Sequence, residues 1–140
     1  MVNRISILGS TGSIGVQTLD VARNLNIKVD GLAANKNIDL LEKQAREFCP
    51  KIVAVKDEEG AKILSARLSD TDCKVVSGID GLKMVASIDT VETVVTSIVG
   101  IAGLIPTMEA IKHKKNIALA NKETLVTAGH IVMSEASRMG

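Results

Sequence analysis

The sequence is almost without aromatic residues. Phe48 is the only aromatic side chain among 140 residues, and there is no Trp and no Tyr. Proteins that read single-stranded nucleic acids stack the bases on exposed rings, and this chain cannot build such a platform. Its 17 Lys and Arg residues nearly balance 16 Asp and Glu residues, which leaves a net charge of +1. Without an overall field, we expect neither nucleic acid nor a membrane as a partner.

Cysteine is also scarce. Cys49 and Cys73 lie outside any Cys-x-x-Cys or Cys/His cluster, so the sequence indicates neither a zinc site nor a redox motif. We expect both to be small buried side chains in a reducing compartment. Paired acids with metal-ligand spacing and a Ser/His/Asp arrangement are absent too. We therefore assign no metal ligand and no catalytic residue within these 140 residues.

Long apolar runs are missing as well. The longest uncharged stretch lies between Glu92 and Glu109 and is interrupted by glycines and a proline. It is shorter than the roughly 18 residues that suggest a membrane-spanning helix. The first apolar run, Ile5–Leu8, is too short for the core of a signal peptide. These features predict a cytoplasmic protein.

What the sequence does contain is a regular alternation of short strands and helices. Apolar residues make up 46% of the chain, and several predicted strands are apolar on both faces. This pattern is typical of a parallel sheet covered by helices on both sides, so we predict one Rossmann-type α/β domain over residues 1–140. Strands are predicted at Arg4–Leu8, Lys28–Ala33, Lys51–Val55, Lys74–Ser77, Thr93–Val99 and Asn116–Ala120. Helices are predicted at Ser13–Asn24, Ile38–Phe48, Glu58–Leu68, Gly81–Ser87, Leu104–Lys112, Lys122–Thr127 and Gly129–Met139.

A glycine-rich loop joins the first predicted strand to the first helix. Its spacing is GxxGxxG, over Gly9, Gly12 and Gly15. In a dinucleotide-binding loop, one glycine makes the tight turn, another lets the backbone approach a pyrophosphate, and a third lets the helix pack closely. The helix N-terminus then faces the phosphates. Thr11 and Ser13 can add hydroxyl donors, and Ser13 is a candidate N-cap. A turn without a ligand is the alternative.

The end of the second predicted strand favours NADPH over NADH. An NAD site expects Asp or Glu there to bind the ribose hydroxyls, whereas this chain has Asn35-Lys36-Asn37. Lys36 would attract a 2′-phosphate, and the two amides can donate hydrogen bonds. Asp30 is the only nearby acid, and it lies inside the strand. The alternatives are an ordinary loop lysine and an N-cap role for Asn37, which can hold together with cofactor binding.

A second polar motif follows the last predicted strand. Asn121, Lys122 and Glu123 come directly after Ala120, at a carboxyl end where open α/β sheets bind ligands. The spacing alone leaves two interpretations open, a ligand site or a capped helix start. His113 falls in a basic cluster, residues 112–115, which we interpret as a solvated helix end. His130 has no partner in the sequence.

Four motifs, in the same order, resemble one known family. They are Gly9–Gly15 followed by Thr18–Val21, Asn35–Asn37, Val99–Leu104 before Pro106-Thr107, and Ala120–Val126. Together they are similar to the N-terminal, NADPH-binding domain of 1-deoxy-D-xylulose 5-phosphate reductoisomerases. The resemblance implies the family's reaction, in which 1-deoxy-D-xylulose 5-phosphate is isomerised and reduced to 2-C-methyl-D-erythritol 4-phosphate for isoprenoid synthesis.

The resemblance also implies site residues. A contact from Lys122 to the sugar-phosphate substrate is implied. Asn35 stands where the family has glycine, so its contact is expected from the backbone. The implied cofactor contacts are Thr11, Gly12, Ser13, Ile14, Asn35, Lys36, Asn37, Asn121 and Glu123.

Other family features fall outside these residues. The family holds a divalent metal, Mg²⁺ or Mn²⁺, with an Asp-Ser-Glu segment that follows this domain, and its full-length members are expected to be homodimers. We therefore expect these 140 residues to bind NADPH without turning over substrate. Two other hypotheses stay open: a semialdehyde dehydrogenase domain, which would need an activated cysteine, and a non-enzymatic NADP-sensing domain. A short-chain dehydrogenase is excluded because the chain has no tyrosine.

Overall fold

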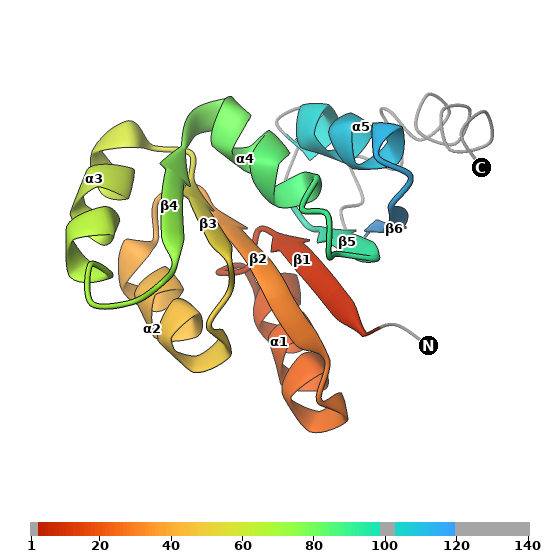
Figure 1. The fold of residues 1–140 in the computed structure, drawn as a ribbon, viewed down its shortest axis with the longest axis horizontal. Helices are drawn as coiled ribbons and strands as arrows, with labels where there is room; N and C mark the ends of the chain where they lie inside the picture. Colours follow the sequence, from red (N-terminus) through yellow and green to blue (C-terminus); the bar gives the residue numbers. More distant parts are fainter. Residues whose placement is uncertain (1–2, 99–102, 120–140) are drawn as a thin grey trace.

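In the computed structural model, which describes residues 3–98 and 103–119, a six-stranded parallel sheet forms the centre of the molecule (Figure 1). Its strand order is β4-β3-β2-β1-β5-β6, and every neighbouring pair is parallel. The strands are β1 (Arg4–Leu8), β2 (Lys28–Ala34), β3 (Ile52–Val55), β4 (Lys74–Ser77), β5 (Thr93–Thr96) and β6 (Asn116–Leu119).

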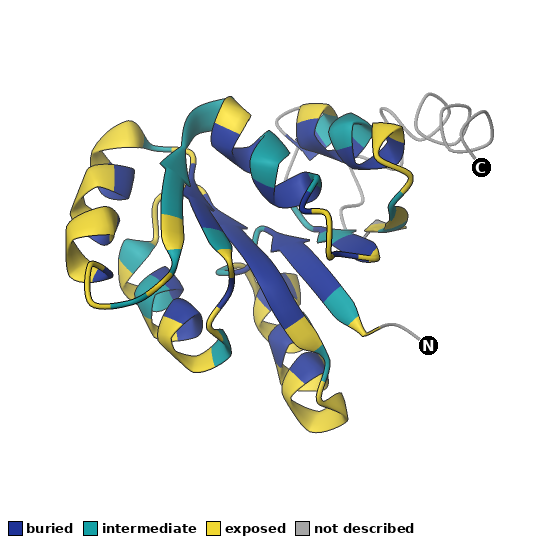
Figure 2. Ribbon diagram, in the orientation of Figure 1, coloured by how far each residue is buried: buried dark blue, intermediate teal, exposed yellow. Residues whose placement is uncertain are grey.

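Helices cover both faces of the sheet, as the pattern predicts. The described helices are α1 (Ser13–Leu25), α2 (Ile38–Phe48), α3 (Glu58–Arg67), α4 (Gly78–Ala86) and α5 (Leu104–Lys112). Successive strand residues point to opposite faces. Ile7 packs with α1, α2 and α3, whereas its neighbour Leu8 packs with α4 and α5. Figure 2 shows buried residues along the central strands and exposed residues on the outer sides of the helices.

The direction of the chain reverses between β1 and β5. From β1 the chain moves outward through β2 and β3 to β4, then returns through α4 to β5 on the other side of β1. In open parallel sheets, ligands bind beyond the carboxyl ends of the strands at such a switch point. The sheet topology therefore places the expected ligand site next to Gly9, which follows β1.

Most predicted elements are confirmed, with differences at their ends. Helix α4 begins at Gly78, three residues before its predicted start at Gly81, and Gly78 has a left-handed φ of +71°. Strand β5 ends at Thr96, because its partner β1 ends at Leu8, whose carbonyl accepts the N–H of Ser97. Its predicted end, Val99, lies outside the described residues. The two helices predicted after residue 120 lie outside the described residues.

Membrane spanning is not supported by the described helices. Over residues 3–98 and 103–119, none of them is long and apolar enough to cross a bilayer. The predicted cellular location stays a prediction.

Candidate dinucleotide-binding site

The glycine loop after β1 is fastened to both neighbouring strands. The N–H groups of Gly9 and Ser10 both donate to Ala33 O of β2, at 2.8 and 2.9 Å. From the β5 side, Ser97 Oγ donates to Leu8 O at 3.0 Å and to Gly9 O at 3.1 Å. These four hydrogen bonds join the loop to β2 on one side and to the residue after β5 on the other.

The three glycines have different steric surroundings. A Cβ on Gly15 would lie 2.2 Å from Gly9 O, and a Cβ on Gly9 would lie 2.7 Å from Ser97 Oγ. Gly9 also has φ +92°, a left-handed conformation that favours glycine. At Gly12, by contrast, the nearest atom to an added Cβ is Gly9 O, at 3.8 Å. Two glycines therefore serve the protein's own packing, and Gly12 leaves open space where a phosphate can approach.

Helix α1 presents its N-terminus to this open space. Its N-cap is Gly12, with no side-chain capping bond, so the prediction of Ser13 as N-cap is wrong. Ser13 is instead the first helical residue, because the chain turns into the helix at Gly12. No described residue accepts a hydrogen bond from the N–H groups of Ser13 and Ile14. Unpaired N–H groups at a helix start attract anions.

Gln44 supports the loop from beneath, and the sequence did not identify it. Its Nε2 donates to Ser10 O at 2.8 Å, and the side chain is buried. Gln44 lies on the buried face of α2 with Leu41 and Ala45. A polar residue on a buried face was the sequence signal that could have identified Gln44 as part of the site. In the described residues, Gln44 Oε1 and Ser10 Oγ are buried without a hydrogen-bond partner.

The segment after β2 lies at the edge of the sheet where its strands end. Asn35, Lys36 and Asn37 are all exposed at the carboxyl edge. Asn37 also caps α2, because its Oδ1 accepts a hydrogen bond from Leu40 N at 3.2 Å. Its N-cap role is therefore confirmed. The carboxylate of Asp30 is turned away from this edge.

Asp30 is a buried structural residue. Its carboxylate accepts two hydrogen bonds from Arg4 Nη1, at 3.0 and 3.1 Å, and one from Thr90 Oγ1, at 2.6 Å. These partners lie near the amino edge of the sheet, opposite the glycine loop. The prediction that Asp30 does not serve the cofactor ribose thus agrees with its position.

A pocket of about 310 Å³ opens at the switch point. It brings together three of the predicted residues, Thr11, Gly12 and Asn35. Ser13, Ile14, Lys36 and Asn37 lie close by in the chain but do not line it. Asn121, Lys122 and Glu123 lie outside the described residues. Among the described residues, its lining is Gly9, Thr11, Gly12, Ala34, Asn35, Lys56, Leu82, Ser97 and Ile98.

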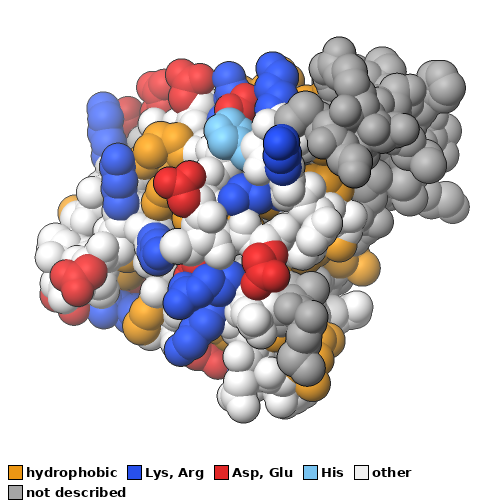
Figure 3. Space-filling view, turned by 45° about the vertical axis from the view of Figure 1, so that its right-hand side comes forward, with side chains coloured by type: hydrophobic (Ala, Val, Ile, Leu, Met, Phe, Trp, Pro, Cys, Tyr) orange, Lys and Arg blue, Asp and Glu red, His pale blue; other side chains and the backbone are white. Residues whose placement is uncertain are grey.

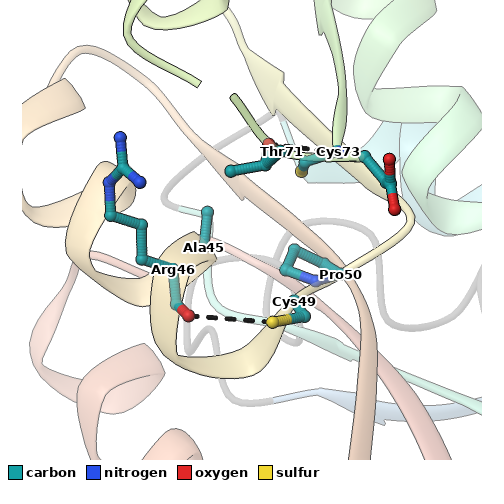
Figure 4. A pocket seen from close by; sticks show the side chains of 7 residues that line it. Ala45, Arg46, Cys49, Pro50, Thr71 and Cys73 are labelled. Atoms are coloured by element: carbon teal, nitrogen blue, oxygen red, sulfur yellow. Dashed lines mark hydrogen bonds between the residues drawn. The ribbon is translucent and has the colours of Figure 1, made fainter. Parts of the chain in front are cut away.

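The two cysteines line a different pocket, of about 280 Å³ (Figure 4). It lies near the starts of β3 and β4, whereas the glycine loop follows the end of β1. Cys49 ends α2 and is exposed, and Cys73 is half-buried, so the prediction that both are buried is wrong. Cys49 is exposed because it takes the left-handed C-cap position of the helix. Burial, and secondarily the nearby Cys49, raises the pKa of the Cys73 thiol to about 11. Cys73 is therefore not activated as a nucleophile.

The basic cluster after α5 is only partly a solvated helix end. His113 is exposed, and its Nδ1 lies 2.9 Å from Glu109 O. Figure 3 shows a histidine side chain on the surface, with lysine or arginine side chains near it. Lys115 behaves differently, because its Nζ donates to Ile88 O and Val91 O at 2.7 and 2.8 Å. It thereby satisfies carbonyl groups of the turn before β5, a structural role that the sequence did not indicate.

A metal site is not formed by the part of the chain that the structure describes. In these ranges, His, Cys, Asp and Glu side chains nowhere gather in a group of three or more that could hold a metal ion. The described residues therefore offer no site for the divalent metal, whose ligands the family resemblance places after this domain.

A doubly wound parallel sheet with a glycine loop at its switch point defines a Rossmann-type nucleotide-binding domain. Comparison with known proteins then assigns the family. The chain belongs to the 1-deoxy-D-xylulose 5-phosphate reductoisomerases, whose family model matches residues 5–129.

Individual relatives agree with this assignment. The 1-deoxy-D-xylulose 5-phosphate reductoisomerase of Acetivibrio thermocellus is 93% identical over 140 residues, which are 100% of this chain and 37% of that protein. That of Ruminiclostridium cellulolyticum is 60% identical over 138 residues, 99% of this chain and 36% of that protein. The structure of the Zymomonas mobilis reductoisomerase in complex with NADPH matches this chain with a TM-score of 0.92 and 34% identity. The match covers 100% of this chain and 37% of that chain. The chain therefore spans little more than a third of its relatives' length.

Family membership decides between the hypotheses left open by the sequence. The resemblance to the reductoisomerases is confirmed. The semialdehyde dehydrogenase hypothesis is not supported, since Cys73 is not activated and both cysteines lie away from the glycine loop. Membership in an enzyme family also favours a cofactor domain over a sensing domain.

Proposed function

We propose that this chain is the NADPH-binding domain of a 1-deoxy-D-xylulose 5-phosphate reductoisomerase, with residues 1–140 forming one domain. One pocket at the switch point supports this function most directly. It is lined by the glycine loop, including the open side of Gly12, and by the start of the Asn35–Asn37 segment. A pyrophosphate needs close backbone approach and free N–H groups, and this pocket borders both.

Each group of residues has its own role in this proposal. Thr11, Gly12, Ser13 and Ile14 would hold the pyrophosphate through backbone N–H groups and hydroxyls. Ser97 and the buried Gln44 would keep the loop in its binding conformation, because they hold the carbonyl groups of Leu8, Gly9 and Ser10.

The adenosine end of the cofactor would be recognised after β2. Lys36 would attract the 2′-phosphate, and Asn35 and Asn37 would donate hydrogen bonds beside it. The acid that an NAD site needs at this position is replaced by these three residues, and Asp30 is engaged with Arg4 and Thr90. We therefore propose NADPH as the cofactor rather than NADH.

In the longer protein, bound NADPH would supply the hydride that reduces the isomerised sugar phosphate. Asn121 and Glu123 stay predicted cofactor contacts, and Lys122 stays a predicted contact to 1-deoxy-D-xylulose 5-phosphate. We derive no step through a metal, because the described residues form no site for one. The homodimer of the full-length protein and the absence of turnover by these 140 residues stay predictions.

Isothermal calorimetry tests the proposed function directly. The chain lacks Trp and Tyr, so heat is a better signal than intrinsic fluorescence. We expect NADPH to bind about tenfold or more tightly than NADH, and Lys36→Ala to reduce that preference sharply. Lys28→Ala removes the same charge at the amino end of β2 and should leave the preference unchanged.

Two negative results of the calorimetry would have different meanings. If neither nucleotide binds to the folded chain, and none binds to the longer natural protein that contains it, the proposed function is wrong. If NADH binds as well as NADPH, the cofactor assignment is wrong and the fold assignment stands.

A further inference from the structure

Two turns at the carboxyl edge of the sheet are joined by their backbones. Lys56 follows β3, and its N–H donates to Ala34 O, the last residue of β2, at 3.0 Å. The next N–H, of Asp57, donates to Asn35 O at 3.1 Å. The two bonds continue the pairing of β2 with β3 beyond the ends of the strands. They fix Lys56 beside the segment that carries Lys36.

The side chain of Lys56 is available to a ligand at this position. It is exposed and lines the same pocket as Thr11, Gly12 and Asn35. Among the described residues, no carboxylate forms an ion pair with it. The adjacent acid, Asp57, is occupied, since its Oδ2 accepts a hydrogen bond from Gly60 N at 3.0 Å and caps α3.

One lysine balances only part of the charge of a 2′-phosphate. A phosphate monoester carries about 1.5 to 2 negative charges near pH 7. Lys36 alone supplies one positive charge, and the flanking asparagines supply none. A second lysine on a flexible four-carbon side chain, held by backbone bonds next to this segment, completes the balance.

From this geometry we infer that Lys56 is a specificity-determining residue, which binds the 2′-phosphate of NADPH together with Lys36. The inference rests on the proposed function and names a residue that neither the glycine motif nor the Asn35–Asn37 segment includes. It also explains how a site with a single lysine after β2 discriminates against NADH, which lacks the charge that both lysines bind.

The test compares two ligands that differ only in the 2′-phosphate, adenosine 2′,5′-bisphosphate and adenosine 5′-monophosphate. Calorimetry gives the affinity ratio of the two ligands for each of four proteins: the unaltered chain, Lys56→Ala, Lys36→Ala and the double variant. We expect Lys56→Ala to weaken the bisphosphate about 5- to 20-fold and the monophosphate less than 2-fold. The bisphosphate preference should also fall as salt is raised, because exposed charges are screened.

Three further variants make the result specific. Lys28→Ala, with the same charge change at the opposite edge of the sheet, should leave the affinity ratio unchanged. Lys56→Arg should retain most of the preference, and Lys56→Asp should abolish it by repulsion. Because Lys28 and Lys56 are both exposed, all three variants should melt at the temperature of the unaltered chain in circular dichroism.

The outcomes separate this inference from the proposed function. If Lys56→Ala weakens both ligands equally, Lys56 contacts the part that they share, and the inference is overturned. It is also overturned if the affinity ratio does not change. If the folded, unaltered chain and the longer natural protein bind neither NADPH nor NADH, the proposed function itself fails. If Lys56→Ala keeps the NADPH preference of the unaltered chain, the role of Lys56 is rejected and the proposed function stands.

Discussion

At the scale of single residues, three glycines in one motif are required for three different reasons. Gly9 turns the chain with a positive φ, Gly15 lets α1 lie against the loop, and Gly12 leaves room for a ligand. A Cβ at Gly15 would come within 2.2 Å of a backbone oxygen, which no side-chain movement can relieve. The same addition at Gly12 meets nothing closer than 3.8 Å. The motif therefore combines folding requirements with a binding requirement.

Alanine substitutions separate these requirements. Gly15→Ala should destabilise the fold by about 2–4 kcal/mol, because the backbone must move to relieve the clash. Gly12→Ala should cost no more than about 1 kcal/mol of stability, the ordinary cost of alanine at an N-cap. It should weaken NADPH binding at least tenfold, because its methyl group would point into the ligand space. Urea denaturation and calorimetry measure the two effects. Equal stability losses in both variants would contradict this division.

At the scale of secondary-structure elements, exposed ion pairs connect the three helices on one face. Arg23 of α1 donates hydrogen bonds to Asp20 and to Glu47 of α2, and it lies 5.4 Å from the ring centroid of Phe48. Arg46 of α2 donates to Asp70, after α3, at 3.1 Å. Exposed pairs of this kind contribute little individually. They orient neighbouring helices that already pack on the same side of the sheet.

The pair between Arg23 and Glu47 predicts a pH dependence with a definite sign. The hydrogen bond from Arg23 holds the pKa of Glu47 below its ordinary range. A carboxyl whose folded pKa is lowered stabilises the fold above its unfolded pKa, about 4.3, and loses that contribution as the pH falls through the folded value. Glu47→Gln should therefore lower the melting temperature by roughly 1–3 °C at pH 7 and by almost nothing near pH 2.

A matched control for this experiment lies on α3. Glu59 is 82% exposed and lies 4.0 Å from Lys62, the outer limit of an ion pair, so Glu59→Gln removes the same charge from a much weaker pair. Its effect should be smaller than that of Glu47→Gln at pH 7. If the cost of Glu47→Gln were the same at pH 2 and pH 7, the ion pair would not be its cause.

At the scale of the whole molecule, one sheet separates two apolar clusters. Leu64 of α3 belongs to the cluster on one face and Leu82 of α4 to the cluster on the other, and each is almost fully buried. Both clusters include residues of β1, β2 and β3, on alternating faces of the same strands. Neither cluster can be lost while the other stays intact, because the strands are shared.

This arrangement predicts a single unfolding transition. Leu64→Ala and Leu82→Ala should each destabilise the fold by about 2–5 kcal/mol. Each variant should still unfold in one transition. Leu25→Ala, at a side chain that is 65% exposed, should cost less than about 0.5 kcal/mol. Thermal and urea denaturation followed by circular dichroism measure all three. Two separate transitions in either core variant would show that the faces unfold independently.

Much of this molecule was predictable from the sequence, for local reasons. The periodicity of apolar residues predicts α2 with the bounds that it has in the structure, because a helix repeats its own buried face. The N-cap role of Asn37 also follows from local sequence. Ser13 was predicted wrongly for the same local reason: a hydroxyl residue at a helix start is a common N-cap, and here Gly12 takes that position.

The sequence by itself determined the strand–helix alternation, the glycine loop and the absence of an acid after β2, since each depends on residues close together in the chain. Only the tertiary structure decided that Gln44 holds the loop at Ser10 and that Lys56 stands beside Asn35. These pairs are separated by many residues. Lys56 meets Asn35 because the parallel strands β2 and β3 align their carboxyl ends, and Gln44 meets Ser10 because α2 packs on the face of the sheet beside the loop. Strand order and register determine such contacts, and no local periodicity encodes them.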